Sequence, residues 1–171
     1  MKVINLFGEP CSGKSTISAG LFYYMKIRNY NVELVTEYAK DLVWEQRDET
    51  FKDQLYITAK QNHRLECLRN KVDYVITDSL ILLGAIYANY NIKYRNSLLL
   101  IVIEQIFKSY DNINFLLNRK LPYKNKGRIH NENQSIYIKE EIIKTLHNNF
   151  INYITIDSDE TSVHKILSKL N

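Results

Sequence analysis

Apolar positions divide the chain into short runs and longer stretches with helical spacing. The short runs are typical of buried strands, and they lie at residues 2–7, 31–35, 73–78, 112–117 and 153–156. The longer stretches contain no Pro and predict helices, with the clearest at residues 15–30, 51–70, 79–90, 97–110, 133–149 and 161–170. Strands that alternate with helices in this way imply a parallel sheet with helices on both faces.

The turn between the first predicted strand and the first predicted helix carries the strongest chemical signal. It fits the pattern G-x-x-x-x-G-K-[ST], the phosphate-binding P-loop. The residues of the loop are Gly8, Glu9, Pro10, Cys11, Ser12, Gly13, Lys14, Ser15 and Thr16. Glycines let backbone N–H groups converge on an anion, and the start of a helix adds its positive dipole end. We therefore expect Lys14 to reach the β- and γ-phosphates of ATP and the Ser15 hydroxyl to bind Mg²⁺.

Five predicted strands with a P-loop after the first indicate an α/β fold of the P-loop kinase kind. Such a fold has three layers, with a five-stranded parallel sheet between two layers of helices. A length of 171 residues favours one domain with a substantial core. Because no internal repeat or linker is visible, we expect a single P-loop kinase domain over residues 1–171.

Two acids follow predicted strands at the edge of the sheet where the P-loop lies. Glu37 comes after the second strand and Asp78 after the third. Ligands of open parallel sheets bind outside the carboxyl ends of the strands, so both carboxylates should face the γ-phosphate. One of them would bind Mg²⁺ and the other would accept a proton from an attacking hydroxyl; we favour Asp78 for the metal and Glu37 for the proton. The structural alternatives are a helix N-cap for Asp78 and a solvated acid in a first helical turn for Glu37.

A basic loop at about residues 118–131 follows the fourth predicted strand. Residues 119–128 contain five Lys or Arg residues and no acid. A flexible loop of this kind can close on the triphosphate as a lid, with Arg119 and Arg128 stabilising the charge that develops during phosphoryl transfer. The alternatives are a solvated run of charges, or a patch that binds a partner, an acceptor phosphate or nucleic acid.

Two further groups of side chains are weaker candidates. Trp44, the only tryptophan, could stack on the ring of an acceptor, but a lone aromatic residue is more often part of the core. Gln54, Gln61 and Arg64 lie on the long predicted helix. Gln61 or Arg64 could read the edge of a base, although we expect a solvated helix face there.

Composition excludes several classes of protein. Hydrophobic residues make up 45% of the chain and charged residues 25%, as in soluble globular proteins. The formal net charge of +4 is too small to argue by itself for a nucleic-acid partner. Cys11 and Cys67 are too few for a disulfide framework, which favours a reducing cytoplasm. No signal peptide is visible and no apolar run is long enough to cross a membrane, so we expect no membrane partner.

Several of these segments together resemble a known kinase family. The P-loop, the segment Thr36-Glu-Tyr-Ala-Lys-Asp41 and the segment Ile76-Thr-Asp-Ser79 resemble the ribosylnicotinamide kinase domain of the bacterial NadR proteins. The loop with Leu121-Pro-Tyr and Lys126-Gly-Arg128 is similar to that of small phage P-loop proteins of the AAA-type ATPase or kinase group. This resemblance covers most of the chain. It implies a kinase fold, ATP with Mg²⁺, a lid after the fourth strand, a nucleoside-like acceptor and a phage-encoded protein in the host cytoplasm.

The predicted activity is transfer of the γ-phosphoryl group of ATP to a nucleoside, nucleotide or related small acceptor. Asp78-Ser79 also resembles the acid-Arg-Ser motif of deoxynucleoside kinases, but the Arg is missing here. Two alternatives stay open. A kinase that acts on a DNA base or end would bind DNA in a salt-sensitive way. A non-catalytic, regulatory ATP-binding switch would bind ATP and transfer nothing.

Overall fold

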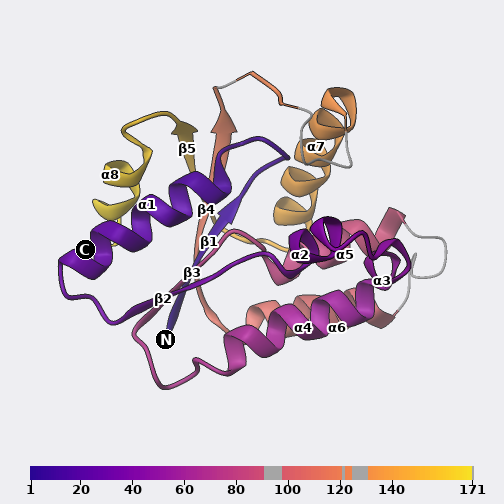
Figure 1. The fold of residues 1–171 in the computed structure, drawn as a ribbon, viewed down its shortest axis with the longest axis horizontal. Coiled ribbons are helices and arrows are strands. Elements are labelled where there is room, and N and C mark those ends of the chain that lie inside the picture. The colour runs from indigo at the N-terminus through magenta and orange to yellow at the C-terminus, as the bar shows by residue number, and fades with distance from the viewer. Residues whose placement is uncertain (91–97, 121, 125–130, 171) are drawn as a thin grey trace.

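The computed structural model describes residues 1–90, 98–120, 122–124 and 131–170, and it contains one five-stranded sheet (Figure 1). Its elements in chain order are β1 (Lys2–Phe7), α1 (Lys14–Ile27), β2 (Val32–Val35), α2 (Tyr38–Trp44), α3 (Asp48–Lys52), α4 (Gln54–Glu66), β3 (Tyr74–Thr77), α5 (Ile81–Tyr90), α6 (Leu98–Lys108), β4 (Asp111–Arg119), α7 (Glu132–Asn148), β5 (Ile154–Ser158) and α8 (Ser162–Leu167). Among the described helices, none is long and apolar enough to span a membrane. The five predicted strands are confirmed, and α1, α5, α6, α7 and α8 lie where helices are predicted.

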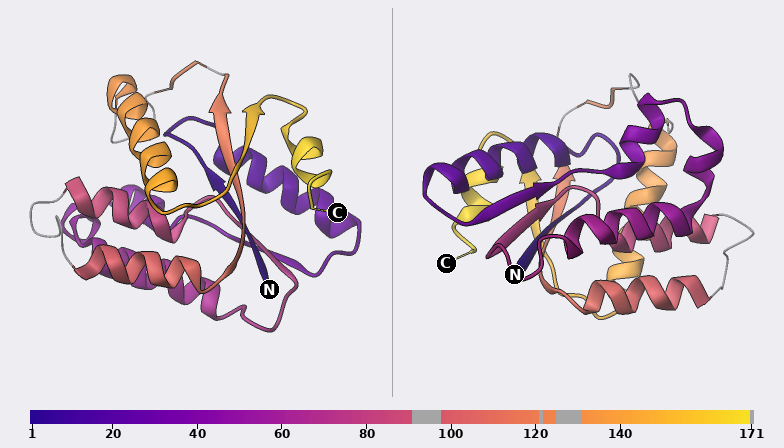
Figure 2. Two further views of the ribbon diagram at one scale, coloured as in Figure 1. Left: turned by 180° about the vertical axis from the view of Figure 1, so that it is seen from behind. Right: turned by 60° about the horizontal axis from the view of Figure 1, so that its bottom comes forward.

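Alternation along β1 determines which helices cover each face of the sheet. Ile4 and Leu6 belong to a core formed with α1 and α8. Val3 and Phe7 point to the other face, where they belong to cores formed with α4, α5, α6 and α7. Figures 1 and 2 show these two groups of helices on opposite sides of the sheet. Because both faces are covered, the central strands are nearly continuous apolar runs.

The order of the strands places the P-loop between two other strand ends. The sheet has the order β2-β3-β1-β4-β5, and its strands pair in parallel. The α/β fold with a five-stranded parallel sheet is therefore confirmed. Because β1 lies between β3 and β4, Asp78 after β3 and Arg119 at the end of β4 flank the loop that follows β1.

The helix predicted over residues 51–70 is wrong in its extent. The structure divides this region into α3 and α4, with a break at Asp53. Asp53 has φ −86° and ψ 86°, and its side chain accepts a hydrogen bond of 3.1 Å from the backbone N of Tyr56. A short acidic side chain that caps the following helix stabilises this non-helical conformation. Helix α4 therefore begins at Gln54 and is separate from α3.

Candidate active site

The P-loop winds tightly between β1 and α1. Gly13 is the N-cap of α1 with φ 86°, and Cys11 also has a left-handed φ of 65°. A Cβ at Gly8 would collide with Ser12 Oγ, so this position requires glycine. Left-handed residues in a tight turn are what an anion-binding nest requires, and α1 begins directly after it. The predicted phosphate-binding residues therefore have a conformation that suits their predicted role.

The side chain of Lys14 lies inside this loop. Its Nζ donates hydrogen bonds to the backbone oxygens of Gly8 at 2.7 Å and Glu9 at 3.0 Å. The end of β5 supports the loop from outside, because Ser158 Oγ donates a hydrogen bond of 2.5 Å to the backbone oxygen of Ser12. The Lys14 ammonium is thus held at the start of α1 by polar groups of the loop itself.

A cleft lies beside the P-loop, between α2, α3, α4 and α5. Lys14 and Glu37 both line it, so the structure brings these two predicted residues together. Aromatic and aliphatic side chains form much of the wall, among them Val43, Phe51, Ile57, Leu83 and Tyr87. Such a cavity, mostly apolar with a few polar groups, is typical of a small-molecule site.

Two glutamines of α4 also line the cleft, and the solvated face predicted for them is wrong. Gln54 is 7% exposed and Gln61 is 3% exposed. They are buried because they share a helix face with Ile57 and Leu65. Gln61 accepts a hydrogen bond from Tyr38 N at 3.1 Å and donates one to Thr36 O at 3.3 Å, so its amide joins α4 to the start of α2.

Gln54 uses one end of its amide within the protein. Its Nε2 donates a hydrogen bond of 3.1 Å to the backbone oxygen of Phe51. A carbonyl oxygen cannot face another carbonyl oxygen at this distance, so this contact also fixes which end of the amide is nitrogen. Arg64, in contrast, donates to Thr36 O at 3.0 Å and forms an ion pair of 2.9 Å with Asp41. It therefore connects helices instead of serving the cleft.

Trp44 is not a core residue, so that interpretation is wrong. It is 66% exposed at the end of α2, and Leu42 is the residue of this helix that is buried. Ala39, Lys40 and Val43 of the same helix line the cleft. Trp44 follows Val43 in the chain, as the last residue of this helix.

Asp78 is buried at the end of β3 and has an unsatisfied oxygen. It is 4% exposed, and its Oδ1 has no hydrogen-bond partner in the part of the chain that the structure describes. The backbone N of Ser79 donates to Thr77 Oγ1 at 3.2 Å. A buried carboxylate oxygen without a partner is costly, and it suits a cation ligand. The described residues contain no group of three or more His, Cys, Asp or Glu that could hold a metal ion.

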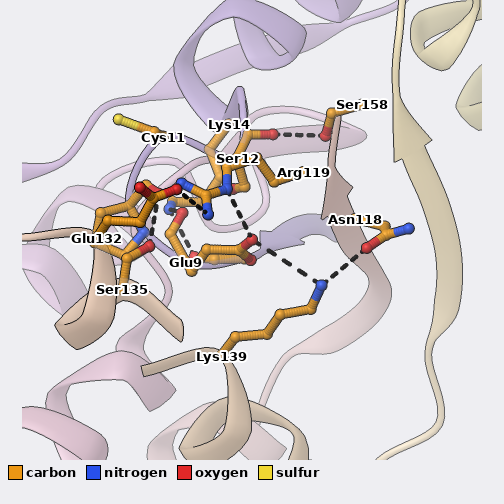
Figure 3. Close-up of polar contacts among 12 residues, drawn as sticks. Glu9, Cys11, Ser12, Lys14, Asn118, Arg119, Glu132, Ser135, Lys139 and Ser158 are labelled. Atoms are coloured by element: carbon orange, nitrogen blue, oxygen red, sulfur yellow. Dashed lines mark hydrogen bonds and ion pairs between the residues drawn. The ribbon is translucent and has the colours of Figure 1, made fainter. Parts of the chain in front are cut away.

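Arg119 lies against the P-loop and is mostly buried. Its Nε is 3.7 Å from Glu9 Oε1 and its Nη2 is 3.2 Å from Glu132 Oε1, as Figure 3 shows. The guanidinium also stacks near the ring of Tyr123, at 5.3 Å from its centroid. Arg128 and much of the predicted lid lie outside the described residues. The structure therefore places one of the two predicted arginines at the site.

Sequence reasoning missed two side chains of this region, Lys139 and Thr58, and it missed the ion pairs of Glu9, which it named only as a residue of the P-loop. The ion pairs of Glu9 and the position of Lys139 depend on contacts between distant segments. Thr58 lines the cleft, and its Oγ1 is buried without a hydrogen-bond partner within the described ranges. A signal for the α4 residues was present, since residues 54, 57, 58, 61 and 65 have the spacing of one helix face.

The P-loop, the strand order and the cleft beside Lys14 define a protein with a P-loop kinase-like fold. The chain belongs to the AAA domain family, which matches residues 3–163. No curated protein matches the sequence.

Solved structures of a deoxyadenosine kinase share this fold. The enzyme from M. mycoides with the products dCMP and a flexible dCDP bound matches with a TM-score of 0.67 and 22% identity, over 100% of this chain and 99% of that chain. The same enzyme with bound dATP matches with a TM-score of 0.63 and 20% identity, over 98% of each chain. At these identities the likeness concerns the fold.

Proposed function

We propose that this protein is an ATP-dependent kinase that phosphorylates a hydroxyl group of a nucleoside-like acceptor. One observation carries the proposal: the same cleft is lined by the P-loop lysine, by an acid and by a buried amide, namely Lys14, Glu37 and Gln54. A phosphate site and a cavity for a ring compound therefore share one space. The fold of the deoxyadenosine kinase, whose structures contain dCMP, dCDP and dATP, supports an acceptor of this class.

At the phosphate end, residues 8–16 bind the triphosphate. Lys14 exchanges its two backbone acceptors for phosphate oxygens, which offer it stronger, charge-assisted hydrogen bonds. Ser15 and Asp78 would hold Mg²⁺, which when bound would neutralise charge on the phosphates. Arg119 and Arg128 stabilise the charge on the transferring group.

At the acceptor end, Glu37 accepts the proton of the attacking hydroxyl. A carboxylate in the lining favours a neutral hydroxyl over an acceptor phosphate, which it would repel. Because Gln54 Nε2 is bound to Phe51 O, the amide oxygen of Gln54 is the end that can accept a hydrogen bond from an N–H group of the acceptor ring. Phe51 and Tyr87 supply aromatic surface for the same ring.

A screen with labelled ATP tests this proposal. The acceptors are nucleosides, ribosylnicotinamide, nucleoside monophosphates and DNA oligonucleotides, and Lys14→Ala is the inactive control. We expect label in one or more nucleosides. Transfer to DNA alone would establish the DNA kinase instead, and ATP binding without any transfer would establish the regulatory switch.

A substitution of Gln54 tests whether the cleft binds the acceptor. Gln54→Leu should raise the KM of the acceptor about tenfold, or ~1.4 kcal/mol, and leave the KM of ATP unchanged, because it removes one hydrogen bond to the acceptor. Gln105→Leu makes the same change at an exposed position of α6 and serves as the matched control. Equal KM values for the acceptor in Gln54→Leu and wild type would remove Gln54 from the acceptor site.

A further inference from the structure

Glu9 is a buried acid inside the P-loop. It is only 3% exposed, and acids are rarely buried unless they are paired. Its Oε1 lies 3.7 Å from Arg119 Nε and 4.0 Å from Lys139 Nζ (Figure 3). Arg119 ends β4 and Lys139 belongs to α7, so one acid of the loop contacts the two elements that border residues 120–131.

The neighbours of Glu9 in the loop contact the same region. Ser135 Oγ on α7 donates a hydrogen bond of 3.0 Å to the backbone oxygen of Pro10. Cys11 Sγ donates one of 3.3 Å to the backbone oxygen of Lys124. Residues 9, 10 and 11 thus each contact the region from β4 to α7. Pro10 and Cys11 do so through hydrogen bonds, and Glu9 does so through ion pairs.

Arg119 is held at two of its three nitrogens. Nε faces Glu9, and Nη2 lies 3.2 Å from Glu132 Oε1. Nη1 is buried, and so is Oε2 of Glu9, and neither has a hydrogen-bond partner among the residues described. A guanidinium that is fixed on two sides, with one nitrogen unsatisfied, is a preorganised donor for an anion.

We infer that Glu9 is a positioning residue, which holds Arg119 beside the P-loop so that the guanidinium is in place when the phosphates of a nucleotide bind. The expected effect on turnover rests on the proposed kinase activity, and the expected effect on nucleotide binding does not. Lys139, which also donates a hydrogen bond of 2.8 Å to Asn118 Oδ1, steadies the acid from the side of α7.

The charge of Glu9 has a second effect, because it opposes the phosphates. In a buried site the carboxylate repels each phosphate group and offsets part of the positive charge of Arg119 and Lys139. Glu9→Gln should therefore tighten nucleotide binding by a factor that increases with the number of phosphates. The same substitution should slow turnover, because Arg119 then keeps only one of its two acidic partners, Glu132. Damage to the fold would instead weaken binding and turnover together.

Titrations with AMP, ADP and ATP, followed by calorimetry, measure the binding effect. For Glu9→Gln we expect the Kd of ATP to fall about tenfold, or ~1.4 kcal/mol, with a smaller change for ADP and the smallest for AMP. The Glu9→Asp variant keeps the negative charge, so its Kd values for AMP, ADP and ATP should equal those of the wild type. Glu140→Gln removes an exposed acid from α7 and is the matched control, which should change none of them.

A double-mutant cycle on kcat tests whether Glu9 acts through Arg119. Glu9→Gln alone should lower kcat about tenfold, and in an Arg119→Gln background it should lower kcat no further. Losses that multiply, or an equal change of Kd for all three nucleotides, would overturn the inference. If Glu9→Gln does not fold, Glu9→Asp and Arg119→Lys form the cycle, with the same expectation. A wild-type protein that binds ATP but phosphorylates no acceptor refutes the proposed function, while the nucleotide series still decides the role of Glu9.

Discussion

At the scale of single residues, Lys14 separates function from stability. Its ammonium donates hydrogen bonds to backbone oxygens of the P-loop, and the residue lines the cleft. Lys14→Ala should therefore lower phosphoryl transfer by about 10³-fold, because it removes a charge aimed at the phosphates. The melting temperature of the Lys14→Ala variant should stay within about 4 °C of that of the wild type. Kinetics and thermal unfolding measure the two effects.

Lys26→Ala is the control for this prediction. Lys26 is on the same helix, in an exposed ion pair of 2.8 Å with Glu33, and its loss should leave turnover unchanged. Turnover near that of the wild type in Lys14→Ala would show that the P-loop interpretation is wrong.

The two acids should differ in their dependence on magnesium. Asp78→Asn should raise the Mg²⁺ concentration needed for half-maximal activity about tenfold, because a buried carboxylate oxygen is replaced by a neutral amide. The Glu37→Gln variant should bind ATP with Mg²⁺ normally. It should transfer the γ-phosphoryl group about 10²-fold more slowly, because no side chain accepts the proton of the attacking hydroxyl. Activity measured against Mg²⁺ concentration distinguishes them. If Glu37→Gln kept both turnover and acceptor KM, Glu37 would be only an acid at the start of α2.

What the sequence predicts at this scale depends on how local the signal is. The P-loop is a contiguous motif, and Glu37 and Asp78 lie within two residues of strand ends, so their places in the chain could be predicted. The ion pairs of Glu9 could not, because Arg119 and Lys139 come from β4 and α7, far along the chain. Long-range side-chain contacts have no periodic signature in a single sequence.

At the scale of elements, α4 and α5 pack closely at Gly84. A Cβ at this position would lie 2.5 Å from Thr58 Oγ1 and 3.6 Å from Ile103 Cδ1. Gly84→Ala should lower the free energy of unfolding by about 1 kcal/mol, because the overlap with Thr58 outweighs the gain of Ala over Gly within a helix. Urea unfolding measures this change.

The Thr58→Ala background tests whether contact with Thr58 causes the loss of stability in Gly84→Ala. In Thr58→Ala the oxygen that the new methyl group meets is absent, so Gly84→Ala should become neutral or stabilising by up to about 1 kcal/mol. The same loss of stability in both backgrounds would contradict the close contact between Gly84 and Thr58.

Element boundaries were less predictable than element types. The stretch at residues 51–70 has neither Pro nor Gly, yet Asp53 ends one helix and caps the next. This depends on a single side-chain hydrogen bond, which competes with a continuous helix at small cost. The polarity of Gln54 and Gln61 predicts a solvated face of α4, but both side chains are buried, while Leu55 on the same helix is 55% exposed. A cleft lined with amides reverses the usual rule that polar helix positions face water.

At the scale of the whole molecule, the parallel sheet could be predicted and the strand order could not. Alternation of strands and helices specifies the class of fold. The order β2-β3-β1-β4-β5 depends on which strands pack against β1, and therefore on contacts between distant segments. This order places Asp78 and Arg119 on opposite sides of the P-loop, so the arrangement of the site is a property of the assembled sheet.

Stability should depend on pH through a cluster that joins the end of α4 to the start of β4. The Tyr110 hydroxyl oxygen lies 2.6 Å from Glu66 Oε1 and 2.7 Å from Asn62 Oδ1, and its one proton serves these two acceptors. Arg69 donates to both oxygens of Glu66, at 2.7 and 2.8 Å. The hydrogen bonds from Arg69, and then that from Tyr110, lower the pKa of Glu66 to about 2 from its ordinary value of 4.5.

Because the pKa of Glu66 is lower in the folded protein than in the unfolded chain, its contribution to stability is complete above about pH 4.5 and is lost as the pH falls towards 2. Glu66→Gln should therefore be less stable than the wild type at neutral pH, and the difference should shrink through this window and vanish near its lower end. Urea unfolding of both proteins across the window measures it, with Glu140→Gln as the exposed control on α7. A difference that stayed constant down to about pH 2 would assign the effect to packing around Tyr110, because a contribution from the charge of Glu66 has to decline through this window.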